Sequence, residues 1–237
     1  MALLGVNVDH IATLRQTRLE FDPDPVSASR ICELAGADSI VAHLREDRRH
    51  IQDKDIIRLK ETCRKRFNIE MSLNDSIIKL ALRVKPHQVT IVPEKRQELT
   101  TEGGLDVVKN FSRVVKASRL FAKNNTEVSL FIDPVKRQIQ KTKDAGIKII
   151  EIHTGHYARL YTQKKHTDEL SRIAEMTQYA RSLGLTVNAG HGLKYDNVKL
   201  IAQIPYMNEL NIGHSIIARA MFVGLKQAVH QMKKLVS

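Results

Sequence analysis

Residues 149–190 read "IIEIHTGHYARLYTQKKHTDELSRIAEMTQYARSLGLTVNAG" and predict one strand–helix–strand unit. A short apolar run opens the stretch at 149–154, and a second run closes it at 186–190. Between them, residues 168–184 begin with an acidic first turn and stop at Gly184, as helices commonly do. Two strands joined by a helical crossover lie parallel in one sheet.

Runs of this kind recur along the whole chain, with starts roughly 20 to 40 residues apart, the length of one βα unit. Most of them are continuously apolar, which is typical of strands covered on both faces of a parallel sheet. Helical stretches separate them; residues 24–37, for example, are apolar at helical spacing and stop at Gly36. The eight runs lie at 3–8, 39–44, 68–73, 88–92, 127–132, 149–154, 186–190 and 209–213.

Eight βα units in 237 residues predict an α/β fold, a (β/α)₈ TIM barrel. A doubly wound open sheet is the alternative, but no GxGxxG motif follows the first run to support it. The sequence shows no linker, no low-complexity tract and no shift of composition. We therefore expect a single barrel domain over residues 1–237.

The formal net charge of +12 favours anionic partners, and both phosphorylated metabolites and nucleic acid fit it. Aromatic residues make up only 5% of the chain and tryptophan is absent, so the stacking platforms of a single-strand binder are sparse. Much of the positive charge has the spacing of solvated helix faces. These features favour small anions and predict no nucleic-acid partner.

Other signals concern the compartment and the metal content. The N-terminal segment has no basic region typical of a signal peptide, and no run of about 18 apolar residues exists, so we expect a cytoplasmic protein with no membrane contact. Cys32 and Cys63 form neither a disulfide framework nor a CxxC pair. Because HExxH and Cys/His ligand spacings are also absent, we expect no metal.

Polar side chains gather where the predicted strands end, which is where TIM barrels place their active sites. These residues are Asn7, Asp9, His10, His43, Arg45, Glu70, Glu151, His153, His191 and His214. Glu70 stands inside an apolar strand, where burial raises a carboxyl pKa toward neutrality, as a general acid or base requires; an ion pair with an arginine is the structural alternative. His43 has the alternative of a core histidine bonded to a backbone carbonyl. Glu151 and His153 are two residues apart and share one face of their strand.

Two glycine–histidine stretches, "NAGHGL" at 188–193 and "LNIGHS" at 210–215, follow the seventh and eighth strands. Barrels often bind phosphate with these two loops, and a helix beginning near Ser215 would add its dipole. Tight turns explain the glycines but not the histidines. A second anion site is predicted around Arg45, Arg48 or His50, with Arg15 or Arg18 closing over either site. Two such sites suggest two phosphorylated substrates.

The motifs, taken in order, resemble one known family. They are "GVNVDHIATLRQTR" at 5–18, "VAHLREDRRHI" at 41–51, "NIEMS" at 68–72, "VPEKRQELTTEGGLD" at 92–106, "EIHTG" at 151–155, "VNAGHGL" at 187–193 and "LNIGHSII" at 210–217. Together they are similar to the pyridoxine 5′-phosphate synthases of the deoxyxylulose-dependent vitamin B6 pathway. The resemblance spans essentially the whole chain.

The resemblance implies a TIM barrel with extra helices, assembled as a homo-octamer built from dimers. It also implies condensation of 3-amino-2-oxopropyl phosphate with 1-deoxy-D-xylulose 5-phosphate to pyridoxine 5′-phosphate, phosphate and water, without metal or cofactor. By the same resemblance His43 and Glu70 accept protons, His191 donates one, and Glu151 stabilises the transition state. The implied substrate-binding residues are Asn7, Arg18, Gly192, Gly213 and His214 for the amino ketone, and Asp9, His10, Arg45, His50 and Thr100 for the deoxyxylulose phosphate.

Two other classes of function remain open on the residues alone. A barrel isomerase or aldolase acting on one phosphosugar predicts one phosphate site and commonly a Schiff-base lysine, yet no lysine stands at a predicted strand end. A nucleic-acid-binding protein predicts binding that weakens steeply with salt. The strand-end carboxylates argue against the latter class.

Overall fold

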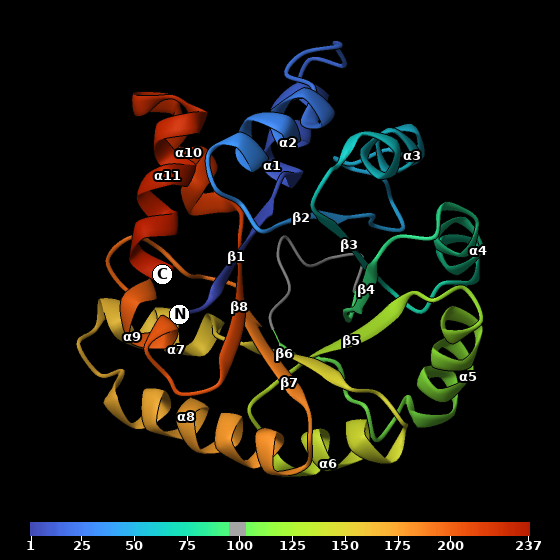
Figure 1. Ribbon diagram of the computed structural model, residues 1–237, viewed down its shortest axis with the longest axis vertical. Helices are drawn as coiled ribbons and strands as arrows, with labels where there is room; N and C mark the ends of the chain where they lie inside the picture. Colours follow the sequence, from blue (N-terminus) through green and yellow to red (C-terminus); the bar gives the residue numbers. More distant parts are fainter. Residues whose placement is uncertain (95–102) are drawn as a thin grey trace.

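Eight parallel strands close into a barrel in the computed structural model, which describes residues 1–94 and 103–237. Neighbouring strands pair in chain order, and β1 (Leu3–Asn7) pairs with β8 (Met207–Ile212) to close the ring (Figure 1). The remaining strands are β2 (Ser39–His43), β3 (Arg66–Met71), β4 (Gln88–Ile91), β5 (Glu127–Ile132), β6 (Ile149–His153) and β7 (Thr186–Gly190). Each apolar run of the sequence contributes one strand, so the predicted TIM barrel is confirmed.

Helices form the outer ring, and several connections carry two of them (Figure 1). In the described residues these are α1 (Asp9–Gln16), α2 (Pro25–Leu34), α3 (Asp53–Thr62), α4 (Asp75–Val84), α5 (Phe111–Ala122), α6 (Lys136–Asp144), α7 (Gly155–Thr162), α8 (Thr167–Ser182), α9 (Val198–Ala202), α10 (His214–Val223) and α11 (Leu225–Val236). Helices α1, α7 and α10 directly follow strands on the side where the strands end. The predicted helices at 24–37 and 168–184 correspond to α2, which ends three residues earlier, and α8, which ends two residues earlier.

Local chemistry explains where α2 begins and ends. The side chain of Asp24 accepts hydrogen bonds from the backbone N–H groups of Val26 and Ser27, and Pro25 occupies the first turn. Gly36 follows the helix with a φ of +108°, a conformation that glycine adopts without steric cost. The cap and the glycine make this boundary readable from the sequence.

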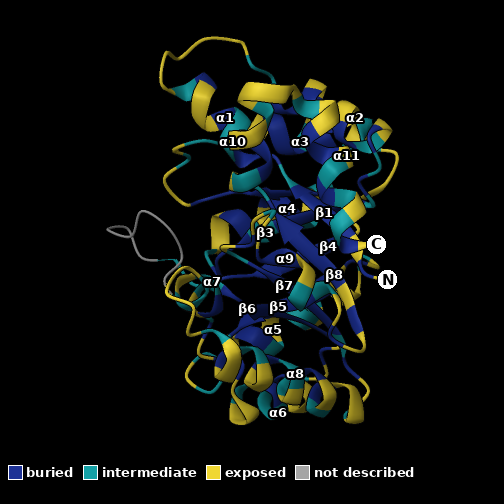
Figure 2. Ribbon diagram, turned by 90° about the vertical axis from the view of Figure 1, so that its left-hand side faces the viewer, coloured by how far each residue is buried: buried dark blue, intermediate teal, exposed yellow. Residues whose placement is uncertain are grey.

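The hydrophobic core lies between the strands and the helices, while the outer faces of the helices are exposed (Figure 2). The two termini lie side by side in both views, and the backbone N–H of Ala2 donates to the carbonyl of Val236 at 3.1 Å. Lys233 on α11 also pairs with Asp38, before β2, at 2.7 Å. In the described part of the chain no helix has the length and apolar character needed to cross a bilayer.

Candidate active site

The carboxyl ends of the strands, from Asn7 to Ile212, form a rim that we call the barrel mouth. Asn7, Asp9, His43 and Glu70 make one connected group there. The Asn7 amide donates to Asp9 Oδ2 at 2.9 Å and to Glu70 Oε2 at 3.5 Å. The backbone N–H of His43 donates to Asp9 Oδ1 at 2.8 Å. Because β1 ends at Asn7 and α1 begins at Asp9, the Asp9 carboxylate turns into the mouth.

His43 has a carboxylate partner that the sequence analysis missed. Its Nε2 lies 2.9 Å from Oε1 of Glu94, and the other Glu94 oxygen accepts from the backbone N–H of Glu46 at 3.0 Å. Burial pushes the pKa of Glu94 upward, but these two hydrogen bonds and the neighbouring charges of His43 and Arg45 together hold the pKa below its usual value. Glu94 is therefore an acceptor that orients the His43 ring.

Two glutamates face the interior of the barrel at this end. Burial raises the pKa of Glu70 well above its ordinary value, and the charges of Glu151 and Asp9 raise it further. Burial also raises the pKa of Glu151 to about 8, although Asn211 Nδ2 donates to its Oε2 at 2.7 Å and opposes the rise. Burial therefore favours the protonated form of both carboxyls, and Glu151 exchanges its proton near neutral pH, as a general acid or base must.

Gly190 makes room for Glu151. A Cβ at this position would lie 2.2 Å from Glu151 Oε1, so a larger residue would displace the carboxyl. Thr154 holds the same loop by donating from its hydroxyl to the carbonyls of Gly190 and His191, each at 2.8 Å. The backbone of His191 has a φ of +77°, which is uncommon for a residue with a side chain and aims the ring into the mouth.

The His191 ring lies against His153, with centroids 5.2 Å apart. Burial, with smaller effects of the neighbouring His153 and Arg159, lowers the pKa of His191 to about 4. The imidazole is therefore neutral at pH 7 when the site holds no ligand. Gly192 follows with a φ of +80°, and a Cβ there would lie 2.7 Å from Cβ of Ala158, so the loop approaches α7 closely.

The loop after β8 completes the predicted phosphate site. Helix α10 begins at His214, one residue before the expected start, and a Cβ on Gly213 would lie 3.0 Å from Asn7 Cβ. The rings of His10 and His214 are in edge-to-face contact with centroids 5.0 Å apart. Burial lowers the pKa of His10, so this ring is neutral near pH 7. Glycine backbone and the start of α10 thus lie beside Asn7 and His10.

The predicted basic residues divide into two groups. Arg45 is buried and bonds through Nε to Asp47 at 3.3 Å, and the His50 ring lies 6.1 Å from the His43 ring. His50 Nδ1 accepts from the backbone N–H of Ile51, so its neutral ring carries the proton on Nε2. Arg45 and His50 therefore lie beside His43 as the second anion site requires.

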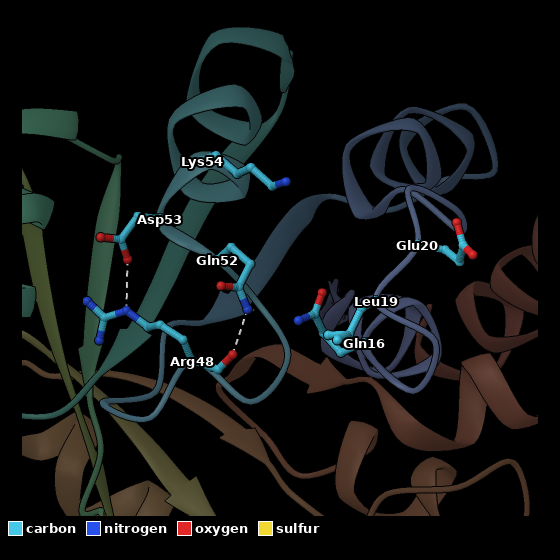
Figure 3. A pocket seen from close by; sticks show the side chains of 7 residues that line it. All are labelled: Gln16, Leu19, Glu20, Arg48, Gln52, Asp53 and Lys54. Carbon is cyan, nitrogen blue, oxygen red and sulfur yellow. Dashed lines mark hydrogen bonds and ion pairs between the residues drawn. The ribbon is translucent and has the colours of Figure 1, made fainter.

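The other predicted arginines have different surroundings. Arg18 is exposed in the turn after α1. Arg48 lines an open pocket of about 500 Å³ between that turn and α3 (Figure 3), where its Nε donates to Asp53 at 2.8 Å and its carbonyl accepts from Gln52. The suggestion that Arg15 closes over a phosphate is wrong, because Arg15 is buried and bonds to both oxygens of Asp55 at 2.8 and 2.6 Å.

Breaking this buried pair is expected to destabilise the fold. In Arg15→Met the Asp55 carboxylate stays buried without its cation, so the free energy of unfolding should fall by about 3 to 5 kcal/mol. The urea midpoint of unfolding measures the change. The double variant Arg15→Met, Asp55→Asn should recover most of it, since no charge is left uncompensated. An unchanged midpoint in Arg15→Met would contradict the role of the pair.

Comparison with known proteins identifies the family. A family model described as "Pyridoxal phosphate biosynthesis protein PdxJ" matches residues 4–237. The chain belongs to the PdxJ family. A relative from Coxiella burnetii (strain RSA 493 / Nine Mile phase I) is 55% identical and one from Prochlorococcus marinus (strain AS9601) is 53% identical, each covering 100% of this chain and 99% of the relative. Both are named pyridoxine 5′-phosphate synthase, so the family expected from the motifs is confirmed and the chain is a biosynthetic enzyme.

Solved structures at low identity share the PdxJ-family barrel. The 3-keto-L-gulonate-6-phosphate decarboxylase of Vibrio cholerae O1 biovar El Tor superposes with a TM-score of 0.69 at 13% identity, covering 99% of this chain and 97% of its own. The KGPDC of Streptococcus mutans gives 0.68 at 14% identity, covering 100% and 97%. At such identities these matches support the TIM-barrel fold alone.

One cluster in the PdxJ-family chain has the geometry of a metal site. Single ligand atoms of Asp9, His43 and Glu70 lie within 4.8 Å of one another, the only such group found in the described residues. Both Asp9 oxygens already accept hydrogen bonds from protein N–H groups, and His43 Nε2 lies against Glu94. The same three residues are candidates for proton transfer, so a chelator control separates the two uses.

Thr100, which is predicted to bind the deoxyxylulose phosphate, lies outside the residues that the structure describes.

Proposed function

We propose that this chain condenses 3-amino-2-oxopropyl phosphate with 1-deoxy-D-xylulose 5-phosphate at the barrel mouth, giving pyridoxine 5′-phosphate, phosphate and water. The observation that carries the proposal is the convergence of His43, Glu70, Glu151 and His191 from four different strands. Burial shifts the pKa values of Glu70 and Glu151 upward and that of His191 downward. Forming an imine, eliminating water and phosphate, and closing an aromatic ring each require proton transfers, and groups of unlike pKa serve such a sequence.

The two phosphates orient the substrates. The amino ketone binds at the loops after β7 and β8, where glycine backbone and the start of α10 accommodate an anion. Its ligands are Asn7, Arg18, Gly192, Gly213 and His214. The deoxyxylulose phosphate binds across the mouth, where buried Arg45 supplies positive charge and burial lowers the pKa values of His10 and His50. Its ligands are Asp9, His10, Arg45, His50 and Thr100.

Glu70 and His43 accept protons in this scheme. Glu70 is linked through Asn7 to Asp9, so the base and a substrate-binding carboxylate share one hydrogen-bond network. Glu94 accepts from His43 and stabilises the imidazolium that forms when this ring takes a proton. Glu151, held by Asn211, donates a hydrogen bond to developing negative charge when it is protonated.

His191 donates a proton in the loaded site. In the ligand-free site its pKa of about 4 keeps the ring neutral. A phosphate dianion beside the ring favours the charged form and raises this pKa, so binding of the amino ketone converts His191 into an acid. The proton donor therefore forms only when substrate is present.

The first experiment measures phosphate release and pyridoxine 5′-phosphate formation by the purified protein. We expect equal amounts of both, only when both substrates are present, and no effect of added EDTA. Product formed from one substrate alone would contradict the condensation. Loss of activity with EDTA and its return with a divalent cation would place a metal at Asp9, His43 and Glu70 instead. Phosphate release without pyridoxine 5′-phosphate would indicate a phosphosugar barrel of another reaction.

We further propose that the protein forms a homo-octamer built from dimers and works in the cytoplasm. Exposed apolar side chains on α2 and α10 support the assembly, including Leu34 at 84% exposure and Phe222 at 90%. Leu34 and Val223 line one surface pocket between α2 and the start of α11, and exposed apolar side chains gathered in one place are typical of protein–protein contacts. The two free cysteines agree with a reducing compartment.

A further inference from the structure

His153 at the end of β6 is buried, with 5% of its surface exposed, and it bonds to a carboxylate outside the group of residues assigned above. Its Nδ1 lies 3.0 Å from Oδ1 of Asp133, which follows β5. This hydrogen bond is the main cause that holds the pKa of Asp133 below its usual value, so Asp133 is a carboxylate. A carboxylate only accepts hydrogen bonds, and Nδ1 of His153 therefore carries the proton and donates it.

The other ring nitrogen of His153, Nε2, is a hydrogen-bond acceptor without a donor. In the neutral tautomer that Asp133 selects, Nε2 of His153 has a lone pair and no proton. Across residues 1–94 and 103–237 this buried atom has no hydrogen-bond partner. Buried polar atoms without partners are uncommon in folded proteins, so the atom indicates a donor that arrives in another state of the site.

Gly155 shows which group is next to this atom. A Cβ at Gly155 would lie 2.4 Å from Nε2 of His153 and 2.9 Å from Cδ2 of His191, so both atoms lie over the same glycine. The planes of the two rings are inclined at 61°, in an edge-type contact. A half-turn of the His191 ring about its Cβ–Cγ bond exchanges Cδ2 with Nδ1, and it brings a ring N–H beside Nε2 of His153.

We propose that His153, oriented by Asp133, is a positioning residue that accepts a hydrogen bond from Nδ1–H of His191. This bond holds the His191 ring with Nε2 toward the substrate, and it stabilises the protonated form of His191. This inference rests on the proposed role of His191 as the proton donor. The chain Asp133, His153 and His191 takes one residue from each of three consecutive strand ends, β5, β6 and β7. A carboxylate at its far end balances the positive charge that the imidazolium brings.

Other charged groups face this chain from the helices packed against it. Arg159 on α7 opposes protonation of His191, and Arg172 on α8 favours the ionised form of Asp133. Glu151 lies beside the His191 loop through its contact with Gly190. The hydrogen bond to Nε2 of His153 therefore counteracts burial and the charge of Arg159, which otherwise keep His191 neutral.

The experiment compares His153→Phe, His153→Gln and Asp133→Asn with the wild-type chain. His153→Phe keeps a ring but removes the acceptor, whereas the side-chain oxygen of His153→Gln can accept from His191. NMR titration of the His191 imidazole, with and without inorganic phosphate, reads its protonation without turnover. We expect the pKa of His191 with phosphate bound to fall by about one unit in His153→Phe, less in Asp133→Asn, and least in His153→Gln.

Turnover supplies the second readout. We expect kcat to fall about tenfold in His153→Phe with KM changed less than twofold, and the alkaline limb of the pH–kcat profile to move to lower pH. His153→Gln should recover part of kcat. His156→Gln, an exposed histidine on α7 that pairs with Glu169, is the matched control and should behave as wild type.

Two results would overturn the proposal. One is a His191 titration that is the same in wild type and His153→Phe, and the other is an equal loss of kcat in the Phe and Gln variants, which a packing role would produce. If His153→Phe does not fold, Asp133→Asn and His153→Gln still decide the question. The two proposals can also fail separately. If the His191 pKa differs between wild type and His153→Phe but the wild-type protein makes no pyridoxine 5′-phosphate, the positioning role stands and the proposed reaction is contradicted.

Discussion

Replacing the buried carboxyl of Glu70 by an amide, Glu70→Gln, is expected to lower kcat by about 10²- to 10⁴-fold, the usual contribution of a general base. Glutamine keeps the size of the side chain and can still accept from the Asn7 amide, which reaches Glu70 at 3.5 Å. It cannot take a proton. We therefore expect KM for both substrates to change little while the chemical step slows.

The pH dependence gives this prediction a second part. A base works only when deprotonated, so activity limited by Glu70 rises as pH passes upward through its pKa, which burial places well above 4.5. This acidic limb should be absent from the residual activity of Glu70→Gln. Steady-state rates between pH 5 and pH 9 measure it, with exposed Glu175→Gln as the matched control. Wild-type kcat in Glu70→Gln would contradict the base role.

Glu151→Gln is expected to change stability and activity in opposite directions. The folded state holds the Glu151 proton up to pH about 8, whereas the unfolded chain loses it near the ordinary value of 4.5. The folded state thus binds more protons between these values, and its stability falls as pH rises through that window, by about 1.4 kcal/mol for each pH unit. Glutamine does not titrate, so the free energy of unfolding of the variant should increasingly exceed that of the wild type as pH rises through this range. Above the range the difference should stay constant.

Thermal and urea unfolding at pH 5, 7 and 9 measure this difference. We expect nearly equal stability at pH 5 and the largest advantage of Glu151→Gln at pH 9, together with a loss of activity at every pH. Because the Glu151 charge helps to raise the pKa of Glu70, the acidic limb should also move to lower pH in any residual activity. A variant less stable than the wild type at pH 9 would show that the carboxyl of Glu151 is not held protonated by burial.

The barrel and most of its polar rim were predictable from the sequence. Continuous apolar runs become strands covered on both faces, and the parallel order brings their carboxyl ends to one rim. For that reason Glu70, Glu151, His43 and His191, which are far apart in the chain, were expected together. The prediction needed only the order of the strands and the position of each polar residue in its run.

Partners between strand ends were not predictable in this way. Glu94 appeared only within the motif at 92–106, with no role of its own, yet it bonds to His43. Asn211 reads as an ordinary strand residue, but it donates to Glu151. Arg15 looked like an anion ligand, although it forms a buried pair with Asp55. Each pairing depends on which side chains meet across the barrel, and no local pattern encodes that.

The sequence by itself determined the eight-stranded barrel, the end of it that carries the chemistry and the family to which the chain belongs, because these follow from periodicity, strand order and motif content. Only the tertiary structure decided the protonation of that chemistry. The pKa of Glu151 rises and that of His191 falls because burial removes both side chains from water. Desolvation and charge are set by the neighbours that close around a group in space, and those neighbours come from other strands.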